Sequence, residues 1–118
     1  MYYMANQNPL SETQAKLTQE LRRGVLVLAT LSQLAEPKYG YALIDRLARH
    51  GLEVEQGTLY PLLRRLEEQG LLQSEWNVEG NRPRRYYVIS ENGKTLLQDL
   101  KADWQQLASV IENLLSQV

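Results

Sequence analysis

The chain has 118 residues and a mass of 13.6 kDa, which is the size of one domain, and it lacks the cysteines that a disulfide, a thiolate metal site or a thiol nucleophile requires. No apolar run reaches the ~18–20 residues of a membrane span, and residues 1–8 lack the order of a signal peptide, so we expect a cytoplasmic protein with no membrane partner. The net charge of −1 and the pI near 5.8 weigh against a nucleic-acid binder, because such domains are usually basic.

The first 14 residues are polar and have no apolar period, which predicts a flexible tail. From about Leu17 to Leu34 the sequence predicts a helix, with an apolar face widened by neighbouring apolar residues. The residues of that face are Leu21, Val25, Leu28 and Leu31. A helix that is apolar over so much of its circumference is buried on two sides. Pro37 ends this helix, because proline restricts the residue before it to extended backbone.

Two short helices follow, from about residue 39 to 50 and from about residue 57 to 69. Glycines end both of them, at Gly51 and Gly70, and Gly57 and Thr58 mark the start of the second. The second helix has one apolar face, formed by Leu59, Leu62, Leu63 and Leu66 at helical spacing. Two short helices joined by a brief connection predict a helix-turn-helix.

The periodicity changes after Gly70. Residues 71–77 and 84–89 are rich in β-branched and aromatic residues, and a turn-rich stretch separates them, which predicts a β-hairpin. The segment from Asn81 to Tyr87 contains three arginines and no acid. Although a charge run is more often a solvated surface than a site, this one lies beside a predicted hairpin tip, so the charge of the chain is unevenly distributed.

Ser90 is predicted to cap a last helix, with Glu91 in its first turn. Apolar residues then alternate at spacings of four and three, as in a coiled coil. They are Leu100, Trp104, Leu107, Ile111, Leu114 and Val118. Such a seam needs a partner surface to cover it, and a second copy of the chain is the economical partner. The chain is thus divided into a tail (1–14), a winged helix-turn-helix (15–89) and a dimerisation helix (90–118).

Catalytic chemistry has little support in the sequence. The single histidine, His50, precedes a glycine at a helix end and has no nucleophile nearby in the sequence. Glu67 and Glu68 are adjacent, so on a helix they diverge by about 100° and do not form a carboxylate pair. No metal-ligand spacing or phosphate-binding glycine loop is present. We expect no enzyme activity, no metal and no cofactor.

Three segments in the same order resemble PadR-like transcriptional regulators, which are small dimeric winged helix-turn-helix repressors of bacteria. They are Tyr39-Gly40-Tyr41-Ala42-Leu43, the stretch from Gln56 to Leu72, and the stretch from Arg84 to Gly93. The resemblance spans roughly residues 20–115. It implies a mainly helical fold of three helices, a two-stranded wing and a C-terminal dimerisation helix. It also implies that a homodimer binds a pseudo-palindromic double-stranded DNA operator.

The residues expected to contact DNA lie on the second helix-turn-helix helix, on the wing and at Tyr39. Arginine and glutamine suit base edges, and the start of a helix suits phosphate. We therefore assign the helix residues to the major groove and its flanking phosphates: Gln56, Thr58, Tyr60, Arg64 and Arg65. The wing arginines Arg82, Arg84 and Arg85 are assigned to phosphate or the minor groove. The resemblance places Tyr39 against the DNA backbone. The plainer reading of Arg64 and Arg65 is a solvated face paired with Glu67 and Glu68.

Trp104 has two readings. On a heptad seam it is a large residue that fills a dimer interface, together with Leu107, Ile111 and Leu114. In some PadR-like regulators the matching tryptophan stacks flat aromatic ligands across a pore at that interface. The resemblance would then line such a pore with Leu21, Gly24, Val25, Leu100, Lys101 and Ala108. Lys101 departs from relatives that have an apolar residue there.

Two other functions remain compatible with the sequence. A winged helix also serves as a protein-interaction module without DNA binding, and the net negative charge fits that use. A drug-binding scavenger without an operator is a third possibility. Tight operator binding that weakens with salt separates the repressor from both.

Overall fold

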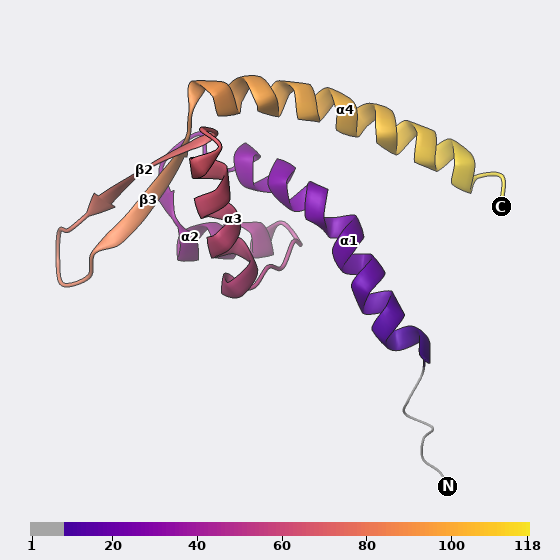
Figure 1. Ribbon diagram of the computed structural model, residues 1–118, viewed down its shortest axis with the longest axis horizontal. Helices are drawn as coiled ribbons and strands as arrows, with labels where there is room; N and C mark the ends of the chain where they lie inside the picture. Colours follow the sequence, from indigo (N-terminus) through magenta and orange to yellow (C-terminus); the bar gives the residue numbers. More distant parts are fainter. Residues whose placement is uncertain (1–8) are drawn as a thin grey trace, which may run out of the picture.

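The computed structural model describes residues 9–118, which form four helices and three strands (Figure 1). In chain order the elements are α1 (Pro9–Ser32), β1 (Lys38–Tyr39), α2 (Gly40–Arg49), α3 (Gln56–Glu68), β2 (Leu72–Asn77), β3 (Arg84–Ile89) and α4 (Glu91–Leu115). The radius of gyration is 18.0 Å, against about 13.5 Å for a compact chain of this length. The excess arises because α1 and α4 extend well beyond the body that the other elements form (Figure 1).

The core is made mostly of leucine. The predicted apolar face of α3 is confirmed, since Leu59, Leu62, Leu63 and Leu66 are all buried. They pack with side chains from the end of α1, from α2 and from the sheet: Leu26, Leu31, Leu34, Leu43, Leu47, Leu72, Tyr87 and Ile89. This closed core holds α3 in place and leaves the opposite face of the helix in solvent.

Both helices of the helix-turn-helix end in the same way. Gly51 follows α2 with a φ of 92°, and Gly70 follows α3 with a φ of 80°. In each case the amide two residues past the helix cap donates to a carbonyl of the last turn, from Leu52 to Leu47 and from Leu71 to Leu66, both at 2.9 Å. This Schellman arrangement needs a left-handed residue, which glycine adopts without steric cost.

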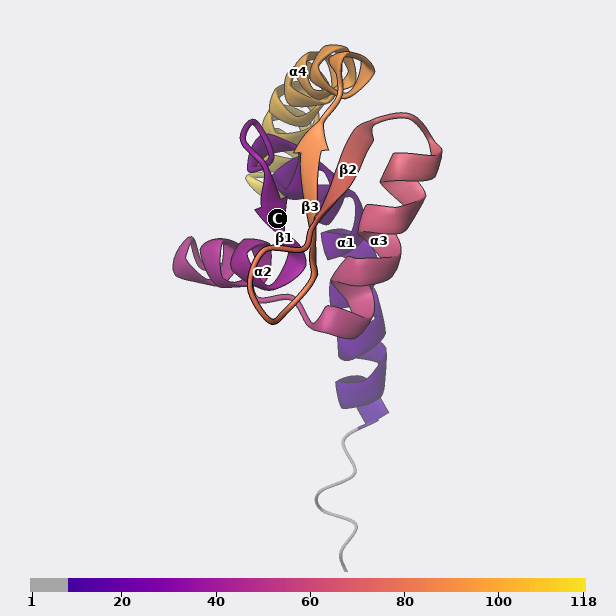
Figure 2. The same cartoon turned by 90° about the vertical axis from the view of Figure 1, so that its left-hand side faces the viewer.

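The sheet has three strands rather than the two expected. β1 pairs antiparallel with β3, with Tyr39 opposite Tyr86, and the strand order is β1-β3-β2. The second helix begins within one residue of the predicted start, since Tyr39 has extended backbone and forms the N-cap of α2, which begins at Gly40. A two-residue strand has no periodicity that a sequence can reveal. α2 lies on the β1 side of the sheet and α3 on the β2 side (Figure 2).

The first helix begins earlier than expected. α1 begins at Pro9, so the predicted tail is wrong for residues 9–14, and residues 1–8 lie outside the described part of the chain. Proline suits the first helical position, where its missing N–H has no helical partner to lose. Residues 10–24 of this helix are all exposed, Leu17 and Leu21 among them, so none of them belongs to the core of one chain.

Ser90 caps α4 as predicted. Its hydroxyl accepts a hydrogen bond from the Gly93 amide at 3.0 Å and donates one to the Gly70 carbonyl at 2.6 Å. Gly93 is tightly placed, because a Cβ there would overlap the Leu71 carbonyl oxygen. The first turns of α4 pack on the core and on α1, whereas the helix beyond residue 100 is exposed except for Ala108. Val118 lies past the end of the helix, so it does not extend the seam.

Candidate nucleic-acid interface

The solvent face of α3 carries most of the polar side chains expected to contact DNA. Gln56, Thr58, Arg64 and Arg65 are exposed, and Tyr60 is half-buried. The N-cap residue Glu55 has extended backbone and makes no side-chain cap, so its carboxylate does not satisfy the first amides of α3. A helix that presents arginines and a glutamine away from its core suits the major groove.

The two arginines of α3 are not paired with the acids that follow them. Among residues 9–118, neither Arg64 nor Arg65 forms an ion pair. Glu67 pairs instead with Arg85 of β3. The plainer reading, in which intrahelical acids neutralise these arginines, is therefore wrong for this structure, and two positive charges remain available on the exposed face.

The start of α2 and the first turns of α3 are held together by Gly40 and Tyr60. A Cβ at Gly40 would overlap the Tyr60 ring, which packs directly on the glycine backbone. Glycine at this position is thus required by close approach rather than by its backbone dihedrals. The contact fixes the Tyr60 ring and brings its hydroxyl end to the groove between the helices and the wing.

Tyr39, Arg84 and Tyr86 form a stack on one face of the sheet. The guanidinium carbon of Arg84 lies 4.4 Å from the centre of the Tyr39 ring, and the Tyr86 ring meets the Tyr39 ring edge-on at 5.5 Å. A cation over an aromatic face is held by the charge distribution of the ring. Arg84 is exposed, so this contact orients the charge without removing it from solvent.

A groove of about 440 Å³ lies between the wing and the two short helices. Five of the nine residues predicted to contact DNA line it, together with Gly40, Trp76, Pro83 and Tyr87. The five are Tyr39, Tyr60, Arg64, Arg84 and Arg85. Gln56, Thr58 and Arg65 lie elsewhere on α3, and Arg82 lines a second hollow of about 480 Å³ at the wing tip. The fold thus gathers the aromatic and basic side chains of three distant segments into one concave surface.

Arg85 differs from the other wing arginines. Its guanidinium donates to Glu67 at 2.8 Å and to the Ser74 hydroxyl at 3.0 Å, and its side chain is 36% exposed. Burial raises the pKa of the neighbouring Tyr87 hydroxyl, and the positive charge of Arg85 opposes that rise. From the sequence, Arg84 and Arg85 have the same expected role. Alternation along a strand predicts that adjacent side chains lie on opposite faces of the sheet, but it does not identify the residues that each side chain contacts there.

The comparisons with known proteins agree with this geometry. Residues 27–99 match the model of the transcriptional regulator PadR-like family. The chain is 39% identical over 90 residues to transcriptional regulator Rv3488 of Mycobacterium tuberculosis, covering 75% of this chain and 84% of that protein. The chain belongs to the PadR-like family of transcriptional regulators.

Solved structures of PadR-like proteins have the same fold. A PadR family regulator from Eggerthella lenta superposes with a TM-score of 0.82 at 48% identity, covering 91% of this chain and 96% of that one. A PadR-like transcription factor from Bacteroides fragilis gives a TM-score of 0.71 at 34% identity, with 84% and 98% covered. The winged helix-turn-helix with a C-terminal helix is therefore confirmed, and the family is one of regulators rather than enzymes.

The side chains that the resemblance assigns to an effector pore of PadR-like proteins lie on α1 and α4, which contact each other. Leu21 is 77% exposed and Trp104 48% exposed, and Gly24 and Lys101 are also exposed. Val25, Leu100 and Ala108 are half-buried. None of the seven lines the hollows described for residues 9–118. An effector pore at this place therefore stays a prediction.

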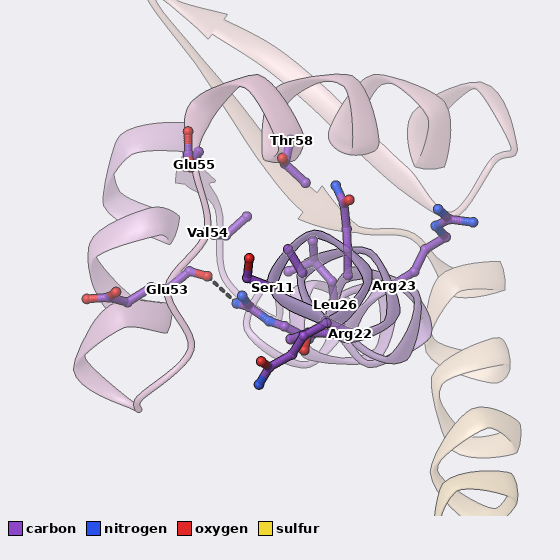
Figure 3. A pocket seen from close by; sticks show the side chains of 12 residues that line it. Ser11, Arg22, Arg23, Leu26, Glu53, Val54, Glu55 and Thr58 are labelled. Atoms are coloured by element: carbon purple, nitrogen blue, oxygen red, sulfur yellow. Dashed lines mark hydrogen bonds between the residues drawn. The ribbon is translucent and has the colours of Figure 1, made fainter. Parts of the chain in front are cut away.

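A larger groove, of about 600 Å³, lies on another side of α1, facing the segment that links α2 to α3 (Figure 3). The Arg22 guanidinium donates to the Glu53 carbonyl across it (Figure 3). Leu26 and Val54 form part of its lining, and Thr58 of α3 borders it. The groove was not anticipated from the sequence, because its two walls are about 30 residues apart and neither has a binding motif.

No helix within residues 9–118 is long and apolar enough to cross a membrane. The same residues contain no group of histidine, aspartate and glutamate side chains placed to hold a metal ion.

Proposed function

We propose that this PadR-like regulator is a repressor that binds double-stranded DNA as a homodimer. The observation that carries the proposal is the concave surface between α3 and the wing, where Arg64 and Arg84 stand among Tyr39 and Tyr60 with no acidic partner among residues 9–118. In a two-fold dimer the two α3 helices enter successive major grooves about 34–36 Å apart on a pseudo-palindromic operator.

The residues divide by the part of DNA that they suit. Gln56, Thr58 and Arg64 lie on the exposed face of α3, where base edges and flanking phosphates are within reach of a helix in the major groove. Arg65, Arg82 and Arg84 supply positive charge for phosphates. Phosphate contacts fix the position of the protein and make its affinity depend on salt, whereas base contacts give sequence preference.

The dimer follows from the apolar surface of α4. Leu107, Ile111 and Leu114 are 50–60% exposed on the single chain, and Val110 and Leu115 on the same helix are 46% and 64% exposed. An apolar surface of this extent on a small protein marks an interaction site. We propose that a second copy covers it, with α4 of one protomer against α1 of the other.

An effector is the regulatory part of the proposal. Trp104 is 48% exposed on the part of α4 that extends beyond the core, so in the proposed dimer its ring would face the partner and a small aromatic ligand could stack there. Such a ligand releases the repressor only if it binds the DNA-free arrangement of the two protomers more tightly. If a Trp104→Ala dimer keeps its operator affinity and every ligand response, this part of the proposal is wrong.

The test is fluorescence anisotropy with a labelled duplex from the region upstream of the gene and with a scrambled duplex, each at several salt concentrations. We expect the upstream duplex to bind at least about 10³-fold more tightly, with affinity that falls steeply as salt rises. A variant with Arg64, Arg82 and Arg84 changed to alanine should lose most affinity for both duplexes. If the unaltered protein binds neither duplex, the repressor function fails, and a winged helix that serves as a protein-interaction module is favoured.

A further inference from the structure

Arg85 of the wing is bound to the recognition helix α3 through a closed set of hydrogen bonds. Its guanidinium donates to Glu67 Oε1 at 2.8 Å, and its Nε donates to Ser74 Oγ at 3.0 Å. The Ser74 hydroxyl in turn donates to Glu67 Oε2 at 2.5 Å. Three elements, β2, β3 and α3, therefore meet at one carboxylate.

Two aromatic rings hold the guanidinium in place. Its central carbon lies 5.9 Å from the centre of the Trp76 ring and 5.5 Å from the centre of the Tyr87 ring. The side chains of Arg85 and Glu67 are 36% and 27% exposed, so this pair is more withdrawn from water than the other ion pairs within residues 9–118. Ion pairs of this kind, with extra hydrogen bonds and rings that fix the cation, are geometrically more specific than mobile surface pairs.

Arg85 reaches the last turn of α3, although its side chain also borders the groove that Arg64 and Arg84 line. Glu67 is in the last turn of the helix, about 15 Å along its axis from Gly57 in the first turn, at 1.5 Å per residue. The preceding residue, Arg84, lies on the other face of the strand and stands over Tyr39. The two adjacent arginines thus have different environments: Arg84 is exposed to solvent, whereas Arg85 is hydrogen-bonded to Glu67 and Ser74.

We propose that Arg85 is a positioning residue that sets the angle of the wing to α3, and that it does not neutralise a DNA phosphate. This inference rests on the proposed function. The β2–β3 hairpin projects from the body (Figures 1 and 2), so a small rotation at its base moves Arg82 near its tip by a larger distance. Holding the hairpin through Glu67 keeps the wing and the recognition helix in one arrangement.

The operator affinity of Glu67→Gln distinguishes the two possible roles of Arg85, phosphate contact and positioning of the wing, because they predict opposite changes. If Arg85 contacted phosphate, the substitution would release it and remove a negative charge, so DNA would bind equally well or more tightly. If Arg85 positions the wing, the substitution loosens the hairpin, and operator affinity falls by about 3–10-fold, as for the loss of one charged hydrogen bond. Glu68→Gln is the matched control, because Glu68 is exposed, adjacent and unpaired among residues 9–118.

The experiment measures operator affinity against salt for Arg85→Met, Glu67→Gln, the double variant, Glu68→Gln and Arg84→Gln. We expect the first two to weaken binding to a similar extent, the double variant to be no worse than either, and the salt slope to stay unchanged. Arg84→Gln should lower the slope by about one, as for one lost phosphate contact. A slope that falls by about one in Arg85→Met, or tighter binding by Glu67→Gln, overturns the proposal.

Unfolding without DNA separates this proposal from the proposed function. Urea midpoints of Arg85→Met, Glu67→Gln and the double variant should be non-additive if the two side chains act through each other, and additive midpoints overturn the proposal. If the unaltered protein does not distinguish operator from scrambled DNA, the repressor function fails, but the midpoints and the salt slope on scrambled DNA still decide the role of Arg85. If the variants at Arg85 and Glu67 do not fold, Ser74→Ala provides the test instead, because it removes only the hydroxyl that bridges the two side chains.

Discussion

The body of the winged helix and the free ends of its terminal helices use apolar side chains in opposite ways. Leu31, Leu34 and Leu43 are fully buried, and they close a core that one chain completes by itself. Leu21 on α1 is 77% exposed and Leu107 on α4 is 60% exposed, although both belong to regular apolar patterns. The same type of residue thus stabilises the fold in one region and remains without a partner in the other. The comparison indicates that the winged helix-turn-helix completes its core within one chain, whereas apolar side chains of the two terminal helices stay exposed, as the proposed dimer would require.

The largest effect should come from opening the closed core. Leu63 is 1% exposed on α3, so Leu63→Ala removes buried methyl groups and leaves a cavity. We expect the free energy of unfolding to fall by about 2–5 kcal/mol, measured by urea denaturation. Leu107→Ala makes the same chemical change on exposed α4 and should alter only dimer stability, seen as a dependence on protein concentration. Equal losses in both variants, independent of concentration, would contradict the division into two regions.

A charge on the exposed seam should separate the protomers while leaving the body folded. Ile111 is 50% exposed, and Ile111→Glu places a carboxylate where the proposed partner helix packs. We expect the dimer dissociation constant to rise by about 100-fold, which corresponds to about 2.7 kcal/mol, with nearly unchanged far-UV circular dichroism. Sedimentation equilibrium measures the change.

The control for the seam is Gln106→Glu, which adds the same charge at another exposed position of α4. It should dimerise as the unaltered protein does. A dissociation constant that is the same for Ile111→Glu and Gln106→Glu would show that another surface forms the dimer.

A smaller effect should arise at the contact between α2 and α3. A Cβ at Gly40 would overlap the Tyr60 ring, so Gly40→Ala should cost about 1–3 kcal/mol through overpacking. The cost should shrink in a Tyr60→Leu background, because the ring that causes it is gone. Gly57→Ala is the matched control, since no atom lies within 4 Å of the added Cβ, and it should be neutral or stabilising by up to about 1 kcal/mol. Thermal melting of Gly40→Ala, Tyr60→Leu, their double variant and Gly57→Ala measures these differences in stability.

The features that sequence predicted well are those set by local repetition. The leucine spacing of α3 gave its buried face, the two glycines gave the helix ends, and Ser90 gave the start of α4. Each depends on residues within one or two turns of one another, where spacing and backbone preference determine the outcome.

The features that sequence missed depend on partners that are distant along the chain. β1 is only two residues long and exists because β3 pairs with it. Glu67 binds Arg85 although the two are 18 residues apart, and no pattern in the run from Arg82 to Arg85 indicates which arginine makes that contact. The sequence did not reveal the early start of α1 at Pro9, because residues 11–14 are polar and none of them is buried in the core.

The smallest expected effect is a loss of stability at high pH, which arises from Tyr87 of β3, where the wing meets the closed core. Tyr87 is 7% exposed, and burial raises the pKa of its hydroxyl above the ordinary value of 10.0, despite the opposing charge of Arg85. Because the folded pKa is the higher one, the contribution of the neutral hydroxyl is fully present below the ordinary pKa. It is lost as the pH rises through the folded pKa. The stability of the unaltered protein should therefore decline above about pH 10 by more than that of Tyr87→Phe.

Urea midpoints measured between pH 8 and 11 give the difference between the two proteins. Tyr41→Phe is the control, because the Tyr41 ring is exposed, and it should retain the full decline. Parallel curves for Tyr87→Phe and the unaltered protein would mean that the closed core of the body does not extend to this hydroxyl.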